Sequence, residues 1–172
     1  MSATESESLD QPARSLASIV GRIIARLESV SYDTLVATPA RIFIAATFWL
    51  SGRTKVDGLL TINQSAFFLF QDEYALPVIP TRLAAYLATY AEHLFPLLLI
   101  IGFASRLSAA ALFFMTLVIQ VFVYPDAWRT HLLWASALAF IVFRGPGALS
   151  VDHLVRKRYV SIQTAAPSRP TH

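Results

Sequence analysis

The residues best suited to chemistry lie within a stretch that otherwise has the composition of a membrane-spanning helix. In ATYAEHLFPLLLIIG (88–102), Glu92 and His93 stand side by side. A charged side chain at the centre of a membrane helix costs about 2.5–3.5 kcal/mol on insertion scales, so it usually has a partner or a function. Pro96 cannot donate a hydrogen bond to the Glu92 carbonyl four positions back, which predicts a kinked and polar pocket there.

Arg41 is the predicted charge partner of Glu92. The two residues lie at similar distances from the outer ends of successive predicted spans, which run antiparallel, so a Glu92–Arg41 pair near the membrane middle is expected. Protonation of Glu92 is the alternative that removes the same charge. Glu92 then acts either as a proton relay in a ligand or redox site, or as half of a pair that only fixes the register of two helices.

Further polar side chains are candidate ligand contacts in a polar ring at or above Glu92. These candidates are Tyr90, His93, Gln120 and His131. The chain has no HxH motif and no pair of histidines at i, i+4, so no metal site is predicted and the histidines are interpreted as hydrogen-bonding residues. P-loop, nucleophile-elbow and HExxH motifs do not occur either, so the sequence leaves open whether the protein is an enzyme.

Composition places the chain in a membrane. Hydrophobic residues make up 55% of it and charged residues 15%, whereas a soluble domain has about 25% charged residues. The chain contains no cysteine, which excludes disulfides, thiol redox chemistry and cysteine-ligated zinc or iron–sulfur sites. The net charge of +3 comes from Arg and Lys near the ends of apolar segments. No basic stripe with interleaved aromatics is present, so nucleic acid is not an expected partner.

Four apolar segments predict an all-α fold, an integral membrane four-helix bundle. The predicted spans cover about 35–52, 83–103, 107–124 and 128–143. At about 1.5 Å per residue, the second span matches a hydrocarbon core about 30 Å thick, whereas the first and fourth are short. Residues 57–80 link the first two spans and contain an apolar, amphipathic helix that is too short to cross the membrane.

Polar segments flank the membrane domain, which is predicted to cover residues 34–160. Residues 1–14 and 161–172 are predicted to be disordered tails. Residues 15–33 place apolar side chains on one helical face and two arginines on the other, which predicts an N-terminal amphipathic helix lying in the membrane interface. The alternative is an amphipathic helix packed against the protein itself.

The charges of the loops predict the orientation of the spans. With four spans and both termini on one side, that side carries nine Arg and Lys residues and the other side carries four. Cytoplasmic segments are the richer in Arg and Lys, so both termini are expected in the cytoplasm.

Several short motifs follow one another in a characteristic order. They are Arg41 in the first span, Ser51-Gly52-Arg53-Thr54-Lys55 at its end, Glu92 in the second span, the Gly-x-x-x-Arg turn from Gly102 to Arg106, and GPGALSVD from Gly145 to Asp152. Together they resemble the pattern of the DoxX family of small four-helix membrane proteins, over about residues 39–154. The resemblance implies a multi-pass protein of the bacterial inner (cytoplasmic) membrane with cytoplasmic termini.

The resemblance also implies two functions of different classes. Some DoxX relatives are subunits of thiosulfate:quinone oxidoreductases, so this chain is expected to bind a quinone between its helices. Glu92 would then relay protons, Arg41 would tune it, and His131 or Tyr90 would contact a quinone oxygen. Other relatives act in oxidative-stress complexes or accompany metal-responsive peptides, which implies a non-catalytic scaffold that recruits a partner under copper or oxidative stress. Either function involves the lipid bilayer and a protein partner or a homo-oligomer.

Overall fold

The computed structural model of the chain describes residues 32–74, 76–77 and 79–165, with the backbone alone for 160–165. The predicted tail at 1–14 and almost all of the predicted interfacial helix at 15–33 lie outside the described residues. The statements that follow concern the described part of the chain.

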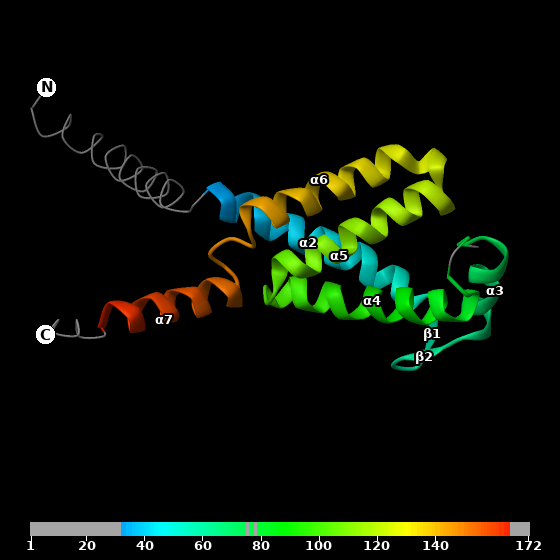
Figure 1. Cartoon of the computed structure of the whole chain (residues 1–172), viewed down its shortest axis with the longest axis horizontal. Coiled ribbons are helices and arrows are strands. Elements are labelled where there is room, and N and C mark those ends of the chain that lie inside the picture. Colours follow the sequence, from blue (N-terminus) through cyan, green and yellow to red (C-terminus); the bar gives the residue numbers. More distant parts are fainter. Residues whose placement is uncertain (1–31, 75, 78, 166–172) are drawn as a thin grey trace, which may run out of the picture. The chain divides into compact units, whose positions relative to one another are not determined.

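Four long helices form the membrane domain and correspond one to one to the predicted spans (Figure 1). They are α2 (Tyr32–Arg53), α4 (Thr81–Ile101), α5 (Ser105–Val118) and α6 (Trp128–Arg144). A π-helical turn, η1 (Ile119–Val123), continues α5, and a 3₁₀ turn, η2 (Pro125–Ala127), leads into α6. A final helix, α7 (Val151–Ala165), runs past the predicted end of the membrane domain at 160.

The described helices confirm an all-α membrane protein. Three of them are long and apolar enough to cross a membrane, namely α2, α4 and α5 continued through η1, while α6 has 17 residues. Large apolar side chains such as Leu50, Leu94, Phe114 and Leu133 are exposed on the outer faces of these helices. In a membrane such faces contact lipid tails, which are as apolar as the side chains themselves.

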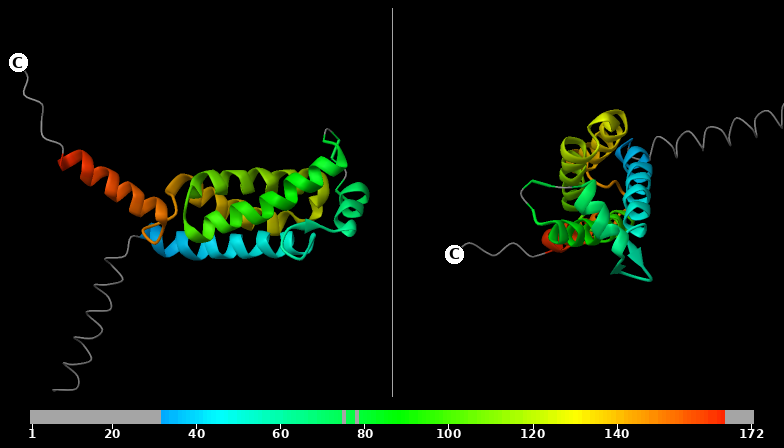
Figure 2. Two further views of the ribbon diagram at one scale, coloured as in Figure 1. Left: turned by 90° about the horizontal axis from the view of Figure 1, so that it is seen from below. Right: turned by 90° about the vertical axis from the view of Figure 1, so that its right-hand side faces the viewer.

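One apolar core joins all four helices. It consists of Ile44, Ala45 and Phe48 of α2, Leu99 of α4, Ala109 and Leu112 of α5, and Leu138 and Ile141 of α6. The Phe48 ring packs against Trp134 of α6 with 5.6 Å between ring centroids. The helices lie side by side, with α7 at one end of the bundle (Figure 2).

The connector (residues 54–80) folds at the end of the bundle opposite α7 (Figures 1 and 2). It contains a short antiparallel hairpin of β1 (Val56–Asp57) and β2 (Thr61–Ile62), followed by α3 (Gln64–Asp72). The hairpin was not expected from the sequence, whereas α3 matches the predicted short amphipathic helix. Asn63 caps α3 because its side-chain oxygen accepts a hydrogen bond of 2.8 Å from the Ala66 amide.

A small second core fastens α3 to the first turns of α4. Phe70 of α3 packs with Ala84 and Ala85 of α4. Alanines at these two positions let the short helix approach the long one closely. The connector is therefore a folded part of the protein that stands directly beside the N-terminal half of α4.

Candidate functional site

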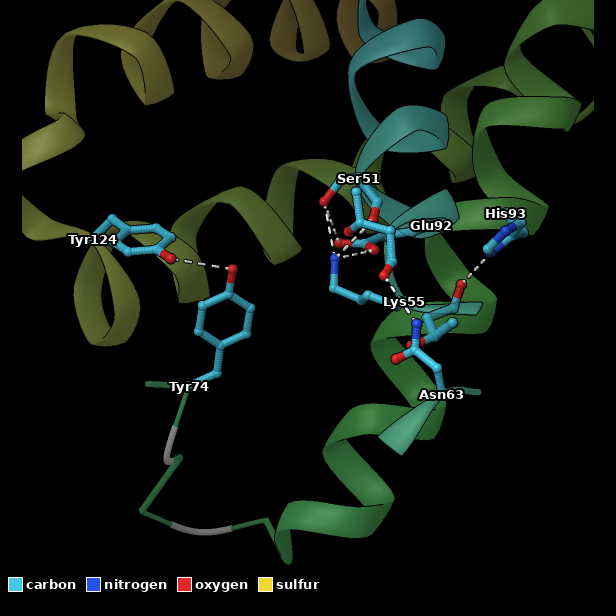
Figure 3. Close-up of polar contacts among 9 residues, drawn as sticks. Ser51, Lys55, Asn63, Tyr74, Glu92, His93 and Tyr124 are labelled. Carbon is cyan, nitrogen blue, oxygen red and sulfur yellow. Dashed lines mark hydrogen bonds and ion pairs between the residues drawn. The ribbon is translucent and has the colours of Figure 1, made fainter. Parts of the chain in front are cut away.

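The buried carboxylate of Glu92 is held by the last turn of α2 and the residues that follow it (Figure 3). Lys55 Nζ donates to Glu92 Oε2 at 2.7 Å, and Ser51 Oγ donates to Glu92 Oε1 at 3.3 Å. Lys55 Nζ also donates to Ser51 Oγ at 2.9 Å, which closes a ring of three side chains. The Lys55 and Glu92 side chains are only 3% and 5% exposed, so each charge depends on the other.

The end of α2 explains why a lysine outside the helix reaches this carboxylate. The last carbonyls of a helix have no partner within it. The Ser51 carbonyl accepts from Lys55 Nζ at 3.1 Å and from Thr54 Oγ1 at 2.8 Å. These bonds fold the chain back over the helix end and point the Lys55 ammonium toward α4.

Gly52 lets α2 and α4 approach closely at this point. A Cβ atom on Gly52 would lie 2.9 Å from His93 Cε1 and 3.1 Å from Glu92 Cβ, closer than real Cβ contacts. Any larger residue would therefore push the two helices apart. The Ser51–Lys55 motif thus supplies three features to one site. They are the hydroxyl donor of Ser51, the close helix approach at Gly52 and the cation of Lys55.

His93 places an unused hydrogen-bond acceptor beside this cluster. Its Nδ1 lies 2.7 Å from the Thr89 carbonyl oxygen (Figure 3). A carbonyl only accepts, so Nδ1 carries the proton, and in the neutral form of the ring Nε2 presents a lone pair. His93 is 6% exposed, and its Nε2 has no hydrogen-bond partner. Trp49 of α2 lies edge-on against the ring, with 5.1 Å between centroids.

The predicted Arg41–Glu92 pair is wrong. The Arg41 guanidinium donates to the carbonyls of Leu99 and Ile100, both at 2.8 Å, and to those of Pro146 and Leu149 at 2.9 and 2.8 Å. Glu92 lies level with the end of α2, whereas Arg41 lies level with the end of α4. The prediction failed because it aligned the outer ends of the first two spans, and α4 in fact extends well beyond the end of α2.

The surroundings of Arg41 form a second buried cluster that closes the other end of the bundle. Arg41 satisfies the orphan carbonyls at the end of α4. The Asp152 carboxylate accepts from the Ala104 and Ser105 amides at 2.8 and 2.9 Å, which caps the first turn of α5. Gly102 has a φ of 75°, and a Cβ there would lie 2.7 Å from Arg41 Nη2. The GPGALSVD motif is therefore part of a structural clamp.

The remaining predicted contacts do not gather around Glu92. His131 Nδ1 lies 2.7 Å from Gln120 Oε1, and Gln120 Nε2 donates to the Pro125 carbonyl at 2.7 Å. These two side chains therefore join α6 to the π-helical turn. Tyr90 is exposed and stacks on Tyr86 with 6.1 Å between ring centroids. Of the predicted ring, only His93 stands directly beside Glu92.

Two tyrosines between the Glu92 cluster and the end of α5 were missed by sequence reasoning. Tyr124 OH donates to Glu73 Oε2 at 3.0 Å and lies 3.3 Å from Tyr74 OH (Figure 3). Burial raises the pKa of Tyr74, and the hydrogen bond with Tyr124 and the charge of Glu92 act in the same direction. Tyr74 therefore stays neutral and within electrostatic reach of the Glu92 carboxylate.

Lys55 and Ser51 were also missed as site residues, although the sequence held a signal for them. They are four residues apart, a spacing that would bring their side chains together on a helix or in a turn at its end. Lys55 was counted among the loop charges that set orientation. Its burial becomes visible only once α2 and α4 are packed together.

Comparisons with known proteins agree with this arrangement. The family model described as DoxX matches residues 36–125, which include Arg41, Lys55 and Glu92 and end before α6. A curated relative, an uncharacterized protein of Haemophilus influenzae, is 30% identical over 129 residues, which cover 69% of this chain and 82% of the relative. No solved structure matches the chain.

Proposed function

The chain belongs to the DoxX family, and from that premise we propose that it is the membrane subunit of an oxidoreductase or stress-response system and binds a quinone-type ligand at the cluster of His93 and Glu92. It is a multi-pass membrane protein by its apolar helices. The proposal places four spans in the inner membrane. Arg106, Arg144 and the basic stretch of α7 lie at the Arg41 end of the bundle, which supports cytoplasmic termini.

The observation that carries the proposal is the unpartnered Nε2 of His93. A buried polar atom without a hydrogen bond costs about 1–3 kcal/mol, so such atoms are rare and call for an explanation. A hydroxyl donor from the lipid phase would satisfy it. A quinol presents a hydroxyl on an apolar ring, and both features suit a site at the edge of a histidine that packs against a partly exposed tryptophan, Trp49.

Glu92 supplies the acid–base group that quinone chemistry needs. Interconversion of a quinone and a quinol moves two electrons and two protons, and a partner protein would carry the electrons. The Glu92 carboxylate, held by Lys55 and Ser51, would exchange the protons. In this proposal Arg41 has no part in the chemistry, because its donors are occupied by carbonyls at the other end of the bundle.

The test is quinone retention by the full-length protein, purified gently from its own membrane. We expect quinone in stoichiometric amounts from the wild type and loss of most of it from His93→Phe, which keeps a flat ring but removes the acceptor. Glu92→Gln should retain the quinone more weakly and lose turnover with an added quinol. Asp72→Asn, an exposed position at the end of α3, is the matched control.

Thermal unfolding of each variant separates site effects from folding effects. The His93 Nδ1 bond is made to its own helix, so His93→Phe is expected to melt close to the wild type. A folded wild type that carries no quinone would overturn the redox proposal.

A non-catalytic scaffold for copper or oxidative stress is the second candidate. The folded connector favours it, because Asn63 and the second core hold α3 as a fixed surface at the end of the bundle. A scaffold would crosslink to the same defined partner in the wild type and in His93→Phe. It would carry no quinone in either protein.

A further inference from the structure

The turn between β1 and β2 exposes two leucines at the tip of a hairpin. Leu59 is 88% exposed and Leu60 is 49% exposed. The chain thus places two bare apolar side chains outside both of its cores. Exposure of this tip to water is unfavourable, because burying a leucine side chain contributes far more free energy than an ordinary surface contact does.

Arg53 fixes the shape of this tip. Its guanidinium donates to the Gly58 carbonyl at 2.8 Å and to the Leu59 carbonyl at 2.9 Å. The strands pair in register, with Val56 opposite Ile62. Carbonyls without partners are not tolerated in lipid, so a turn in which the carbonyls of Gly58 and Leu59 are already satisfied is better suited to enter a bilayer.

The hairpin also points in the right direction. It runs back from the start of α3 alongside α4 (Figure 1), and it projects sideways from the bundle when seen along the bundle axis (Figure 2, right). The hairpin follows directly on α2, which is long and apolar enough to cross the membrane. Leu50 and Trp49 are exposed on the last turns of α2, so the end of the span that leads into the hairpin is also apolar.

We propose that the Leu59–Leu60 tip inserts into the lipid leaflet at the end of α2 and anchors the connector to the membrane. Asp57 is exposed on β1 and keeps the strands at the headgroup level, so the tip enters only the shallow part of the leaflet. Arg53, at the same level, suits the anionic phosphates of that region. This anchor is independent of any ligand at Glu92.

The experiment uses the absence of cysteine in the chain, which makes single-cysteine labelling clean. Leu59→Cys, in the full-length protein, is labelled with an environment-sensitive fluorophore and reconstituted into phosphatidylcholine vesicles containing phosphatidylglycerol. Quenching is compared for lipids that carry a spin label near the headgroup or deep in the chain. Phe114→Cys, exposed at the middle of the span formed by α5 and η1, is the lipid control, and Asp72→Cys, exposed at the end of α3, is the water control.

We expect the Leu59 label to emit to the blue of the Asp72 label. It should be quenched severalfold more strongly by shallow spin-labelled lipids than the Asp72 label is, whereas the Phe114 label should respond more to the deep quencher. Leu60→Cys should behave as Leu59→Cys does. Emission and quenching at the level of the Asp72 label would overturn the proposal. So would a blue-shifted label that lipid quenchers do not reach, because a second copy or another protein would then cover the tip.

Discussion

The two buried charged clusters of this protein hold their charges in opposite ways. Arg41 is a lone cation whose donors go to neutral carbonyls at the ends of helices and loops. Glu92 is an anion paired directly with the Lys55 ammonium at 2.7 Å. Within the described residues, the four hydrogen bonds of Arg41 all join its side chain to backbone carbonyls, so the fold itself is its partner. The Glu92 pair instead joins side chains, beside a histidine whose Nε2 has no partner.

The Arg41 arrangement is typical of a structural contact, whereas the Glu92 arrangement is typical of a ligand site. A guanidinium that uses four of its five N–H donors on neutral carbonyls is held in a fixed geometry and cannot give up a proton. A carboxylate in an ion pair can gain a proton and still keep a hydrogen-bond partner. The unpartnered Nε2 of His93 next to it can accept a hydrogen bond from a ligand. We therefore assign stability to the Arg41 cluster and chemistry to the Glu92 cluster.

Loss of Arg41 should have the largest effect. Arg41→Leu leaves four carbonyls without their donor, and at about 1–3 kcal/mol for each buried unsatisfied group the free energy of unfolding should fall by more than about 4 kcal/mol. Chemical unfolding of the purified protein in detergent measures it. Arg106→Leu, an exposed arginine at the same end, is the control and should stay near the wild type. Equal losses for the two variants would contradict the clamp.

Breaking the Lys55–Glu92 ion pair should lower the free energy of unfolding somewhat less than the loss of Arg41 does. Lys55→Met leaves a buried carboxylate unpaired and should lower the free energy of unfolding by about 3 kcal/mol. Adding Glu92→Leu should restore part of that loss, because the unpaired charge is then gone. The measurement is a double-mutant cycle by unfolding.

The same cycle applied to Arg41 and Glu92 sharpens the comparison. These two residues share no partner, so their effects should add within about 0.5 kcal/mol, as they do for independent sites. Strong coupling between them, or none between Lys55 and Glu92, would reverse the roles given to the clusters.

Gly52→Ala should disturb the Glu92 site with a moderate effect on stability. Its Cβ would lie 2.9 Å from His93 Cε1, and overpacking of this kind costs about 1–3 kcal/mol. Retained quinone should fall along with stability, because His93 is displaced. Gly58→Ala is the control: its Cβ meets no atom within 4 Å, so only the strain of a positive φ is expected and quinone should be retained.

The smallest effect is expected at the surface ion pair between Arg144 and Asp33. Arg144 Nε lies 2.8 Å from Asp33 Oδ1, but water reaches both side chains. Exposed pairs contribute about 0–1 kcal/mol, so Arg144→Ala should shift the unfolding midpoint only slightly, and less at high salt. A loss of stability as large as that of Arg41→Leu would mean that the Arg41 end of the bundle depends on this ion pair.

The sequence predicted the helices well because the length and composition of an apolar run are local properties. Each predicted span overlaps one of the four long helices, three of which are long and apolar enough to cross a membrane, and the short helix after the hairpin was also predicted. Partners across the bundle could not be predicted in the same way. Estimating the depth of a residue by counting from the end of its span assumes that neighbouring helices end at the same level. In the structure α2 and α4 are offset along the bundle, and this offset moves Glu92 away from Arg41. The carbonyl partners of Arg41 could not be predicted either, because every residue has a backbone carbonyl and residue type does not indicate which of them accepts a hydrogen bond.

The central claim is that Glu92 exchanges a proton when a quinone-type ligand is reduced or oxidised. The most direct measurement is the infrared difference spectrum of the reconstituted protein on adding quinol together with a soluble electron acceptor, in the region of the protonated carboxyl stretch. We predict a carboxyl band that disappears in Glu92→Gln and persists in Asp72→Asn. A spectrum without that band, or one that Glu92→Gln leaves unchanged, would contradict the account.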